Sequence, residues 1–192
     1  RGMSSAASDV YKRQIINSLG KSKHIKTQAS SLQNSSESST GMKEKHKKAH
    51  MKAAFAYAEC STAERLKVGC VIVKDDRIIS IGYNGTPSGW DNECEYLSSF
   101  DHDGKPLIKP ILMTRDEVLH AESNAVAKLA RCGESGEGAA AFITHEPCLQ
   151  CAKLLYQSGI KEIYYAHAYR NHDGLEFLQK CNIKVEKRYE LR

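Results

Sequence analysis

Two short stretches of the sequence contain side chains suited to metal-assisted chemistry. The string HAESNA contains His120 and Glu122, and the string HEPCLQC contains Cys148 and Cys151. Imidazole nitrogens and thiolates bind zinc well, and three protein ligands with one open position are typical of catalytic rather than structural zinc sites. A carboxylate beside such a site need not bind the ion and can transfer protons. The residues predict a zinc centre formed by His120, Cys148 and Cys151, with Glu122 as the catalytic residue.

The spacing of His120 and Glu122 constrains the local structure. Residues two positions apart do not share a helix face, so the pair could not act together in mid-helix. The objection disappears at a helix start, because an ion can lie beyond the end of the axis. We therefore expect the helix to begin within a residue or two of His120 and to end near Cys132 and Gly133. Cys148 follows a proline at an expected strand-to-helix junction, where unpaired N–H groups and the helix dipole favour a thiolate.

Each motif alone is open to other interpretations. A C-x-x-C string also occurs as a redox pair or by chance, and a His near a Glu on a helix is more often structural. The combination is more specific: H-x-E at one helix start, then a strand, then P-C-x-x-C at the next helix start, is similar to the signature of zinc-dependent nucleobase deaminases. In that chemistry zinc lowers the pKa of its bound water, and the carboxylate carries the protons.

The elements expected around these motifs alternate between helix and strand. A helix is predicted over 43–60, followed by two strands around a tight turn at Asp75 and Asp76. Residues 86–117 combine Pro, Gly and mixed charge and predict a long irregular connection of the kind that often carries function. After the helix at His120, strands are predicted over 139–146, 161–169 and 183–189, and helices over 148–159 and 174–181. This order predicts an α/β fold, a three-layer α-β-α sandwich with a mixed sheet of about five strands.

The first 41 residues differ in composition from the rest of the chain. They are Ser-rich and carry six basic and two acidic side chains, so most of the formal net charge of +5 lies there. We expect a disordered leader, 1–41, and the string SSAASDVYKRQ resembles the translation of an adapter used in sequencing libraries. Part of the leader is therefore expected to be an assembly artefact, with Met42 as the native start. The nearly neutral remainder makes no strong case for a nucleic-acid partner.

The distribution of apolar residues and the cysteine content indicate the cellular compartment of the protein. No run of about 18 apolar residues is present, which predicts no membrane partner, and no secretory signal is recognisable. Seven cysteines without an export signal indicate a reducing compartment. We expect a cytoplasmic protein, or one of the host cytoplasm if the source is viral.

The strings GYNGTPSG, HAESNA and PCLQCAKLLYQSGIKEIYY together resemble the deoxycytidylate (dCMP) deaminases of the cytidine deaminase superfamily. The similarity extends over 43–189, so residues 42–192 are expected to form one zinc-dependent deaminase domain with a cytidine deaminase-like fold. The resemblance implies hydrolysis of dCMP to dUMP and ammonia, which supplies dUMP for thymidylate synthesis. It also implies one catalytic Zn²⁺, bound by His120, Cys148 and Cys151, with Glu122 as the proton shuttle.

The resemblance further implies substrate contacts. Asn84 would meet the sugar 3′-hydroxyl, the backbone of Ala121 and Thr144 would contact the base edge, and Tyr169 would help to close the pocket. Asn84 also has a simpler interpretation as a turn residue, because Asn and Gly accept positive φ. Lys67 could bind the nucleotide phosphate, or it could be only a solvated charge at a strand end.

Regulation and assembly are implied by the resemblance alone. Family members are commonly hexamers, activated by dCTP and inhibited by dTTP through a site near the glycine-rich loop. This implies a homo-oligomer, nucleotide effectors and Mg²⁺ bound with dCTP. Some phage members hold a second, structural zinc in the region of Cys94 and His102. Here the stretch before VGC reads AERLK and Cys60 is displaced, so we expect a single, catalytic zinc ion.

Two other functions remain open. The chain could deaminate free cytidine or tRNA adenosine, although nucleoside enzymes usually carry Cys where this chain has His120, and tRNA enzymes should show a basic groove. It could instead be a structural zinc module that binds nucleic acid. Glu122 argues against that module, because a structural site has no use for an unliganded carboxylate.

Arg170, like Lys67, is a candidate for binding the substrate phosphate, and the sequence alone does not favour one over the other.

Overall fold

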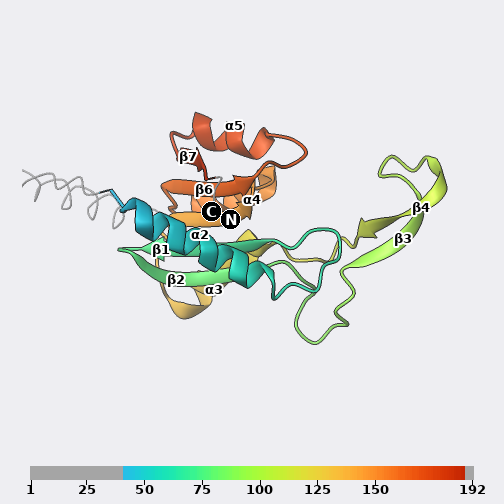
Figure 1. The fold of residues 1–192 in the computed structure, drawn as a ribbon, viewed down its shortest axis with the longest axis horizontal. Helices are drawn as coiled ribbons and strands as arrows, with labels where there is room; N and C mark the ends of the chain where they lie inside the picture. Colours follow the sequence, from blue (N-terminus) through green and yellow to red (C-terminus); the bar gives the residue numbers. More distant parts are fainter. Residues whose placement is uncertain (1–40, 189–192) are drawn as a thin grey trace, which may run out of the picture. The chain divides into compact units, whose positions relative to one another are not determined.

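The computed structural model describes residues 41–188 of the 192-residue chain, so the predicted leader lies outside the described residues except for Gly41. The elements are α2 (Glu44–Ala58), β1 (Gly69–Lys74), β2 (Arg77–Tyr83), β3 (Glu95–Phe100), β4 (Pro106–Thr114), α3 (Ala121–Cys132), β5 (Ala140–His145), α4 (Leu149–Gln157), β6 (Glu162–His167), α5 (Asp173–Lys180) and β7 (Lys184–Lys187) (Figure 1). Between residues 41 and 188, no helix combines the length and apolar character needed to cross a membrane.

A mixed sheet of five strands forms the centre of the fold, in the order β2-β1-β5-β6-β7. Strand β1 is antiparallel to both β2 and β5, whereas β5, β6 and β7 are mutually parallel. Strands β2 and β5 therefore run in the same direction with β1 between them. The chain leaves β2 and returns at Leu119, whose N–H donates to the carbonyl of Gly85 at 2.9 Å. Helices α3 and α4 consequently begin at the same edge of the sheet.

Helices cover both faces of the sheet, which confirms the predicted three layers. In β5, Ala141 and Ile143 pack into the core formed with α3, α4 and α5. The alternate residues Ala140 and Phe142 pack on the opposite face against α2. Because both faces are buried, β5 reads as a continuous apolar run rather than an alternating one. Figure 1 shows α2 lying across the sheet.

The prediction of an irregular connection over 86–117 was wrong in part. Strands β3 and β4 pair as a separate antiparallel hairpin, with Leu97 opposite Leu112, and Figure 1 shows it extending beyond the main sheet. Most side chains of both strands are exposed, so the sequence shows no alternation of apolar and polar residues. Pro106 and Pro110 also argue against a strand, although proline is tolerated where no neighbouring strand needs its N–H.

Backbone angles test the predicted turns. Asp75 and Asp76 have φ of 51° and 59°, the left-handed pair that a tight hairpin turn requires, which confirms that turn. Gly133 follows α3 with φ of 70°, as predicted for a helix end. The turn interpretation of Asn84 was wrong. It is not among the described residues with positive φ, and the following Gly85 bridges to Leu119 instead.

Candidate metal centre and active site

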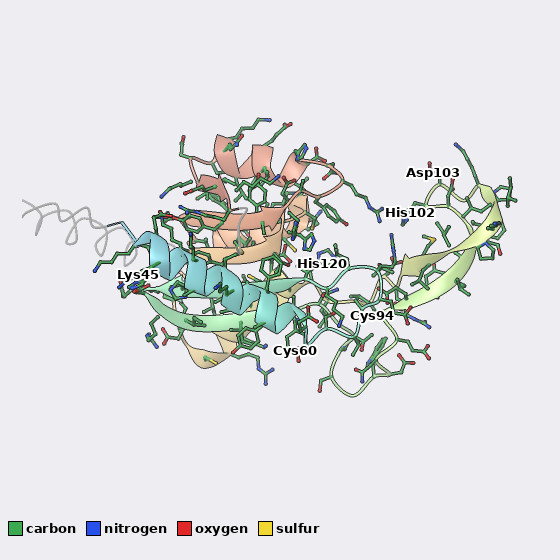
Figure 2. The ribbon with its side chains drawn as sticks, viewed as in Figure 1. Lys45, Cys60, Cys94, His102, Asp103 and His120 are labelled. Carbon is green, nitrogen blue, oxygen red and sulfur yellow. The ribbon has the colours of Figure 1, made fainter. Side chains whose placement is uncertain are left out.

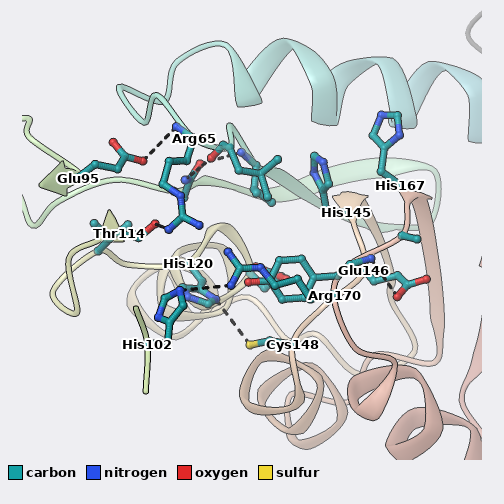
Figure 3. Close-up of a pocket in the computed structure, with 17 residues that line it drawn as sticks. Arg65, Glu95, His102, Thr114, His120, His145, Glu146, Cys148, His167 and Arg170 are labelled. Atoms are coloured by element: carbon teal, nitrogen blue, oxygen red, sulfur yellow. Dashed lines mark hydrogen bonds between the residues drawn. The ribbon is translucent and has the colours of Figure 1, made fainter. Parts of the chain in front are cut away.

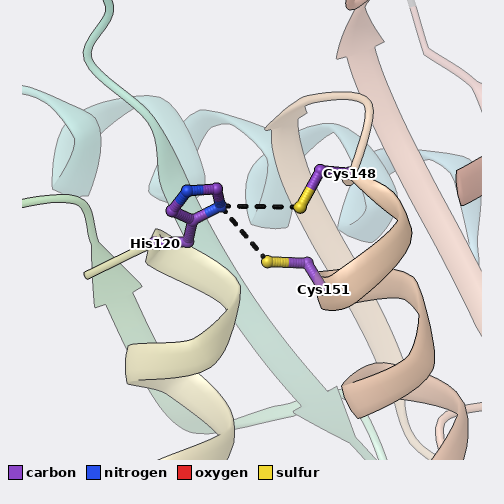
Figure 4. Close-up of side chains that lie close together, drawn as sticks. All are labelled: His120, Cys148 and Cys151. Atoms are coloured by element: carbon purple, nitrogen blue, oxygen red, sulfur yellow. Dashed lines mark hydrogen bonds between the residues drawn. The ribbon is translucent and has the colours of Figure 1, made fainter. Parts of the chain in front are cut away.

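Three potential metal ligands lie at the first turns of two helices. His120 is the N-cap of α3 and Cys148 the N-cap of α4, each with extended backbone angles. Cys151 follows in the first turn of α4. The expectation that the helix begins within a residue or two of His120 is confirmed. Figure 4 shows the three side chains converging from the two helix ends.

The spacing of these groups fits zinc. The Nδ1 atom of His120 lies 3.7 Å from Cys148 Sγ and 3.4 Å from Cys151 Sγ, and the three atoms all lie within 4.8 Å of one another. Tetrahedral zinc with ordinary Zn–N and Zn–S bond lengths separates such ligand atoms by about 3.5–3.8 Å. Among residues 41–188, no other group of three or more His, Cys, Asp or Glu side chains meets this criterion.

The two thiols differ in their ionisation. Hydrogen bonds with Cys151 and His120 lower the pKa of the Cys148 thiol to about 3. The hydrogen bond with Cys148, together with burial, raises the pKa of Cys151 well above its ordinary value. Cys148 therefore ionises readily, whereas Cys151 becomes a thiolate only when a nearby positive charge compensates for the second negative charge. A divalent cation supplies that compensation, because thiolates rather than thiols bind metal.

Glu122 lies in the first turn of α3, beside this cluster. It is only 4% exposed, and burial raises the pKa of its carboxyl. A buried carboxyl with a raised pKa can accept and release protons closer to neutral pH than an ordinary one. Glu122 also lines the cavity described next, so its buried carboxyl lies at the cavity wall.

A cavity of about 640 Å³ opens over the two helix ends, and we call it the active-site cavity (Figure 3). Its volume is in the range of pockets that enclose small ligands. His120, Glu122 and Cys148 line one part of it. Other polar lining residues come from the segment before β1, from the segment after β2, from the β3–β4 hairpin and from the segment after β6: Arg65, Asn84, Glu95, His102, Tyr169 and Arg170.

Two of the predicted substrate contacts reach the cavity. Tyr169 lines it, and so does Asn84. The Asn84 side chain is already engaged, since its oxygen accepts the N–H of Val68 at 2.7 Å and its amide donates to the carbonyl of Leu66 at 2.8 Å. Asn84 therefore holds the segment before β1 in place along the cavity wall.

The other three residues are not among those that line the cavity. Ala121 and Thr144 are fully buried, and the contacts of their backbone with the base edge stay a prediction. The hydroxyl of Thr144 accepts the N–H of Gly69 at 3.1 Å. Lys67 does not line the cavity either, and its ammonium lies 3.8 Å from the carboxylate of Glu59.

Basic residues from other segments occupy the cavity wall instead. Arg65, which the sequence reasoning missed, donates to the hydroxyl of Thr114 at 3.0 Å. Arg170 lies 3.5 Å from His102 of the hairpin turn, Nη1 to Nε2. In the described part of the chain neither guanidinium forms an ion pair. No local pattern marks Arg65, because the hairpin that completes this wall was not predicted.

The cysteines considered for a second zinc site can also be placed. Cys94 is buried at the base of the hairpin, and its sulfur lies 3.4 Å from the hydroxyl of Thr62. Figure 2 shows Cys94 and Cys60 at separate positions, both apart from His120.

Comparisons with known proteins agree with this geometry. A family model described as the cytidine and deoxycytidylate deaminase zinc-binding region matches residues 43–167. ComE operon protein 2 of Bacillus subtilis (strain 168) is 36% identical over 131 residues, which are 66% of this chain and 62% of that protein. The deoxycytidylate deaminase of Enterobacteria phage T4 is 34% identical over 165 residues, covering 70% of this chain and 86% of the relative.

A solved structure extends the similarity to the fold. The dCMP deaminase of cyanophage S-TIM5, crystallised in complex with dCMP and dUMP, is 41% identical with a TM-score of 0.67. The match covers 77% of this chain and 100% of that one, which confirms the predicted cytidine deaminase-like fold. The chain belongs to the family of cytidine and deoxycytidylate deaminases that carry the zinc-binding region.

Proposed function

We propose that this protein hydrolyses dCMP to dUMP and ammonia in a zinc-dependent reaction. The observation that carries the proposal is the convergence of His120, Cys148 and Cys151, within 4.8 Å of one another, beside the buried Glu122 at a cavity wall. The similarity to the S-TIM5 dCMP deaminase, over the whole length of that chain, supports dCMP as substrate.

His120 through Nδ1 and the sulfurs of Cys148 and Cys151 would hold the zinc ion. When bound, zinc lowers the pKa of a water molecule so that hydroxide is available at neutral pH. The two helix N-termini direct their positive dipole ends at the same place and so favour the thiolate ligands.

Glu122 moves the protons. In the reaction a C4–O bond forms on the cytosine ring and the C4–N bond breaks. Glu122 takes a proton from water and delivers it to the ring nitrogen, and a second transfer protonates the departing amino group so that it leaves as ammonia. Its burial raises the pKa of the carboxyl, which suits a group that must both accept and donate.

We assign phosphate binding to Arg65 and Arg170 in place of Lys67. Both guanidiniums line the cavity, and in the described residues neither is neutralised by a carboxylate. A guanidinium donates two parallel hydrogen bonds to phosphate oxygens, which gives both affinity and orientation. Lys67 lies outside the cavity lining and pairs with Glu59.

A substrate panel tests the assignment. Ammonia release is measured for the zinc-loaded protein with dCMP, CMP, deoxycytidine and dCTP, and inosine formation with a tRNA substrate. We expect dCMP to give the highest kcat/KM. Arg65→Ala and Arg170→Ala should each raise the KM for dCMP without affecting deoxycytidine, and Lys67→Ala is the control. Equal kcat/KM values for deoxycytidine and dCMP would contradict phosphate binding by Arg65 and Arg170. A preference for tRNA would establish the alternative function.

We further propose a homo-oligomer, a hexamer by family resemblance. Supporting it, the hairpin exposes five large apolar residues: Tyr96, Leu97, Phe100, Ile108 and Ile111. A two-stranded hairpin with such a surface gains stability when another surface covers it. Light scattering of the purified protein should give a mass about six times that of the chain. A monomer at working concentration would contradict the proposal.

The remaining proposals concern regulation and location. Following the resemblance, dCTP with Mg²⁺ should activate the enzyme at subsaturating dCMP and dTTP should inhibit it, and unchanged rates with both would contradict this. None of the seven cysteines forms a disulfide, which supports a reducing, cytoplasmic environment.

A further inference from the structure

Glu146 is a buried carboxylate that the proposed chemistry leaves without a role. It stands between β5 and Cys148, and its side chain is only 3% exposed. Burying a carboxylate is costly unless hydrogen bonds replace the lost water. The partners that supply those bonds indicate what the residue does.

The partners of Glu146 lie in β6, which includes Tyr165, and in the segment that joins β6 to α5. Its Oε2 accepts the backbone N–H of Tyr169 at 3.2 Å and lies 2.8 Å from His172 Nδ1. Its own N–H donates to the carbonyl of His167 at 2.9 Å. One residue therefore bonds the chain at the end of β6 and at two points of the segment that follows it.

A second close approach fixes the far end of this segment. A Cβ placed on Gly174 would lie 2.1 Å from the carbonyl oxygen of Pro147, so the start of α5 presses directly on the backbone next to Glu146. Between the attachments at His167 and His172, residues 168–171 are partly or fully exposed. Tyr169 and Arg170, in that stretch, both line the active-site cavity.

Among the described residues, Glu146 forms no ion pair with Arg170. Glu146 lines the same cavity, yet its Oε2 is directed to a backbone N–H and to His172 rather than to the guanidinium. Arg170 is exposed, and its Nη1 lies 3.5 Å from Nε2 of His102. Its position therefore depends on the backbone that carries it.

We propose that Glu146 is a positioning residue: it holds the segment 168–172 so that Arg170 and Tyr169 face the substrate, while it leaves the guanidinium free for phosphate. The inference rests on the proposed function, because it assumes that Arg170 binds the phosphate of dCMP. It concerns substrate affinity and not the hydrolytic step.

The test compares Glu146→Ala, Glu146→Gln, Arg170→Ala and the double variant of Glu146→Ala with Arg170→Ala, using the zinc-loaded protein. Glu146→Ala should raise the KM for dCMP about tenfold with a smaller change in kcat, because a buried N–H loses its acceptor. Glu146→Gln should recover most of the affinity, since the amide oxygen still accepts the N–H of Tyr169. In the Arg170→Ala background, Glu146→Ala should have little further effect.

Controls separate positioning from general damage. Kinetics with deoxycytidine should be unaffected, and zinc content should stay at one per chain. Glu176→Ala removes an exposed carboxylate of equal charge from α5 and should leave the KM unchanged. His172→Ala removes one partner of Glu146 from the exposed side and should raise the KM by a smaller factor, which keeps the test valid if Glu146→Ala does not fold.

Equal losses with dCMP and deoxycytidine, or full additivity with Arg170→Ala, would overturn the positioning role. So would Glu146→Gln and His172→Ala variants that both keep the wild-type KM. Failure of the proposed function is a separate outcome, because it would appear as absent dCMP turnover in the wild-type protein.

Discussion

Glu122 and Cys148 experience opposite electrostatic effects at the starts of α3 and α4. Burial raises the pKa of the Glu122 carboxyl, whereas hydrogen bonds from Cys151 and His120 lower the pKa of Cys148. One group is thereby suited to carry protons and the other to bind a cation. The contrast in pKa follows from environment, since both lie in the first turn of a helix or at its cap.

Glu122→Gln should keep zinc and fold and lose catalysis. The amide has nearly the same size but cannot accept and release protons, so dUMP formation should fall by at least about 10²-fold. Turnover and zinc content are measured on the same preparation, with the exposed Glu117→Gln as control. Retained turnover would contradict the proton-shuttle role, and loss of zinc would show that the carboxylate supports the metal site itself.

His145 should make stability sensitive to mild acid. Burial, and then the charge of His167, lower the pKa of His145 to about 4 from an ordinary value of 6.5. Between these values the unfolded chain binds the proton and the folded chain does not, so the free energy of unfolding falls as pH drops through this window. Urea unfolding above and below the window should show a smaller loss for His145→Gln than for wild type. An equal loss in both would contradict this account.

The sequence predicted the catalytic cluster better than the rest of the cavity. His120, Cys148 and Cys151 are identifiable because short-range spacing places each of them at a helix start. Arg65 and Glu146 follow no local pattern. Their roles depend on loops whose paths are set by tertiary contacts, such as the bond from Glu146 to the N–H of Tyr169.

At the scale of elements, the metal centre depends on how closely α3 approaches the sheet. Gly82 of β2 lies beneath the first turn of α3, where an added Cβ would lie 2.0 Å from the carbonyl oxygen of Ala121 and 2.7 Å from the nitrogen of Ala125. Neither helix nor strand can yield there without moving backbone. The glycine therefore allows α3, with His120 at its N-cap, to lie this close to β2.

Gly82→Ala should displace α3 and weaken both fold and metal binding. Overpacking of this kind costs about 1–3 kcal/mol in the free energy of unfolding. Gly85→Ala is a matched control, because a Cβ at that position meets nothing within 4 Å. Chemical unfolding and zinc titration of the two variants compare the effects. Wild-type zinc affinity in Gly82→Ala would contradict the dependence on helix position.

The elements of the sandwich were predictable, and the hairpin was not. Strand β5 and helices α3 and α4 carry apolar runs or helical periodicity because both faces of the sheet are buried. Strands β3 and β4 have no buried face of their own, so their residues show no period that a sequence analysis could detect. The hairpin matters for the site because Glu95 accepts the N–H groups of Glu64 and Arg65, at 3.1 and 3.3 Å.

At the scale of the whole molecule, the metal should join the two halves of the site. His120 comes from α3, and Cys148 and Cys151 come from α4, across a fold in which these helices follow different strands. A ligand that binds only the folded state stabilises it according to its concentration relative to its Kd. Zinc should therefore stabilise the entire domain.

Removal of zinc by a chelator should lower the Tm by roughly 5 °C or more, and added zinc should restore it. Thermal unfolding of chelated, zinc-loaded and Cys151→Ser protein measures the effect. The Cys151→Ser variant should resemble the chelated protein and respond weakly to zinc. An unchanged Tm in all three would show that the metal does not bind at this cluster.

The most direct measurement is dUMP formation from dCMP as zinc is returned to metal-free protein, followed by NMR of the nucleotide. The account predicts no turnover without metal, then dUMP and ammonia in equal amounts, with the rate rising until one zinc ion is bound per chain. Protein that is folded, holds one zinc ion at this cluster and leaves dCMP unchanged would contradict it.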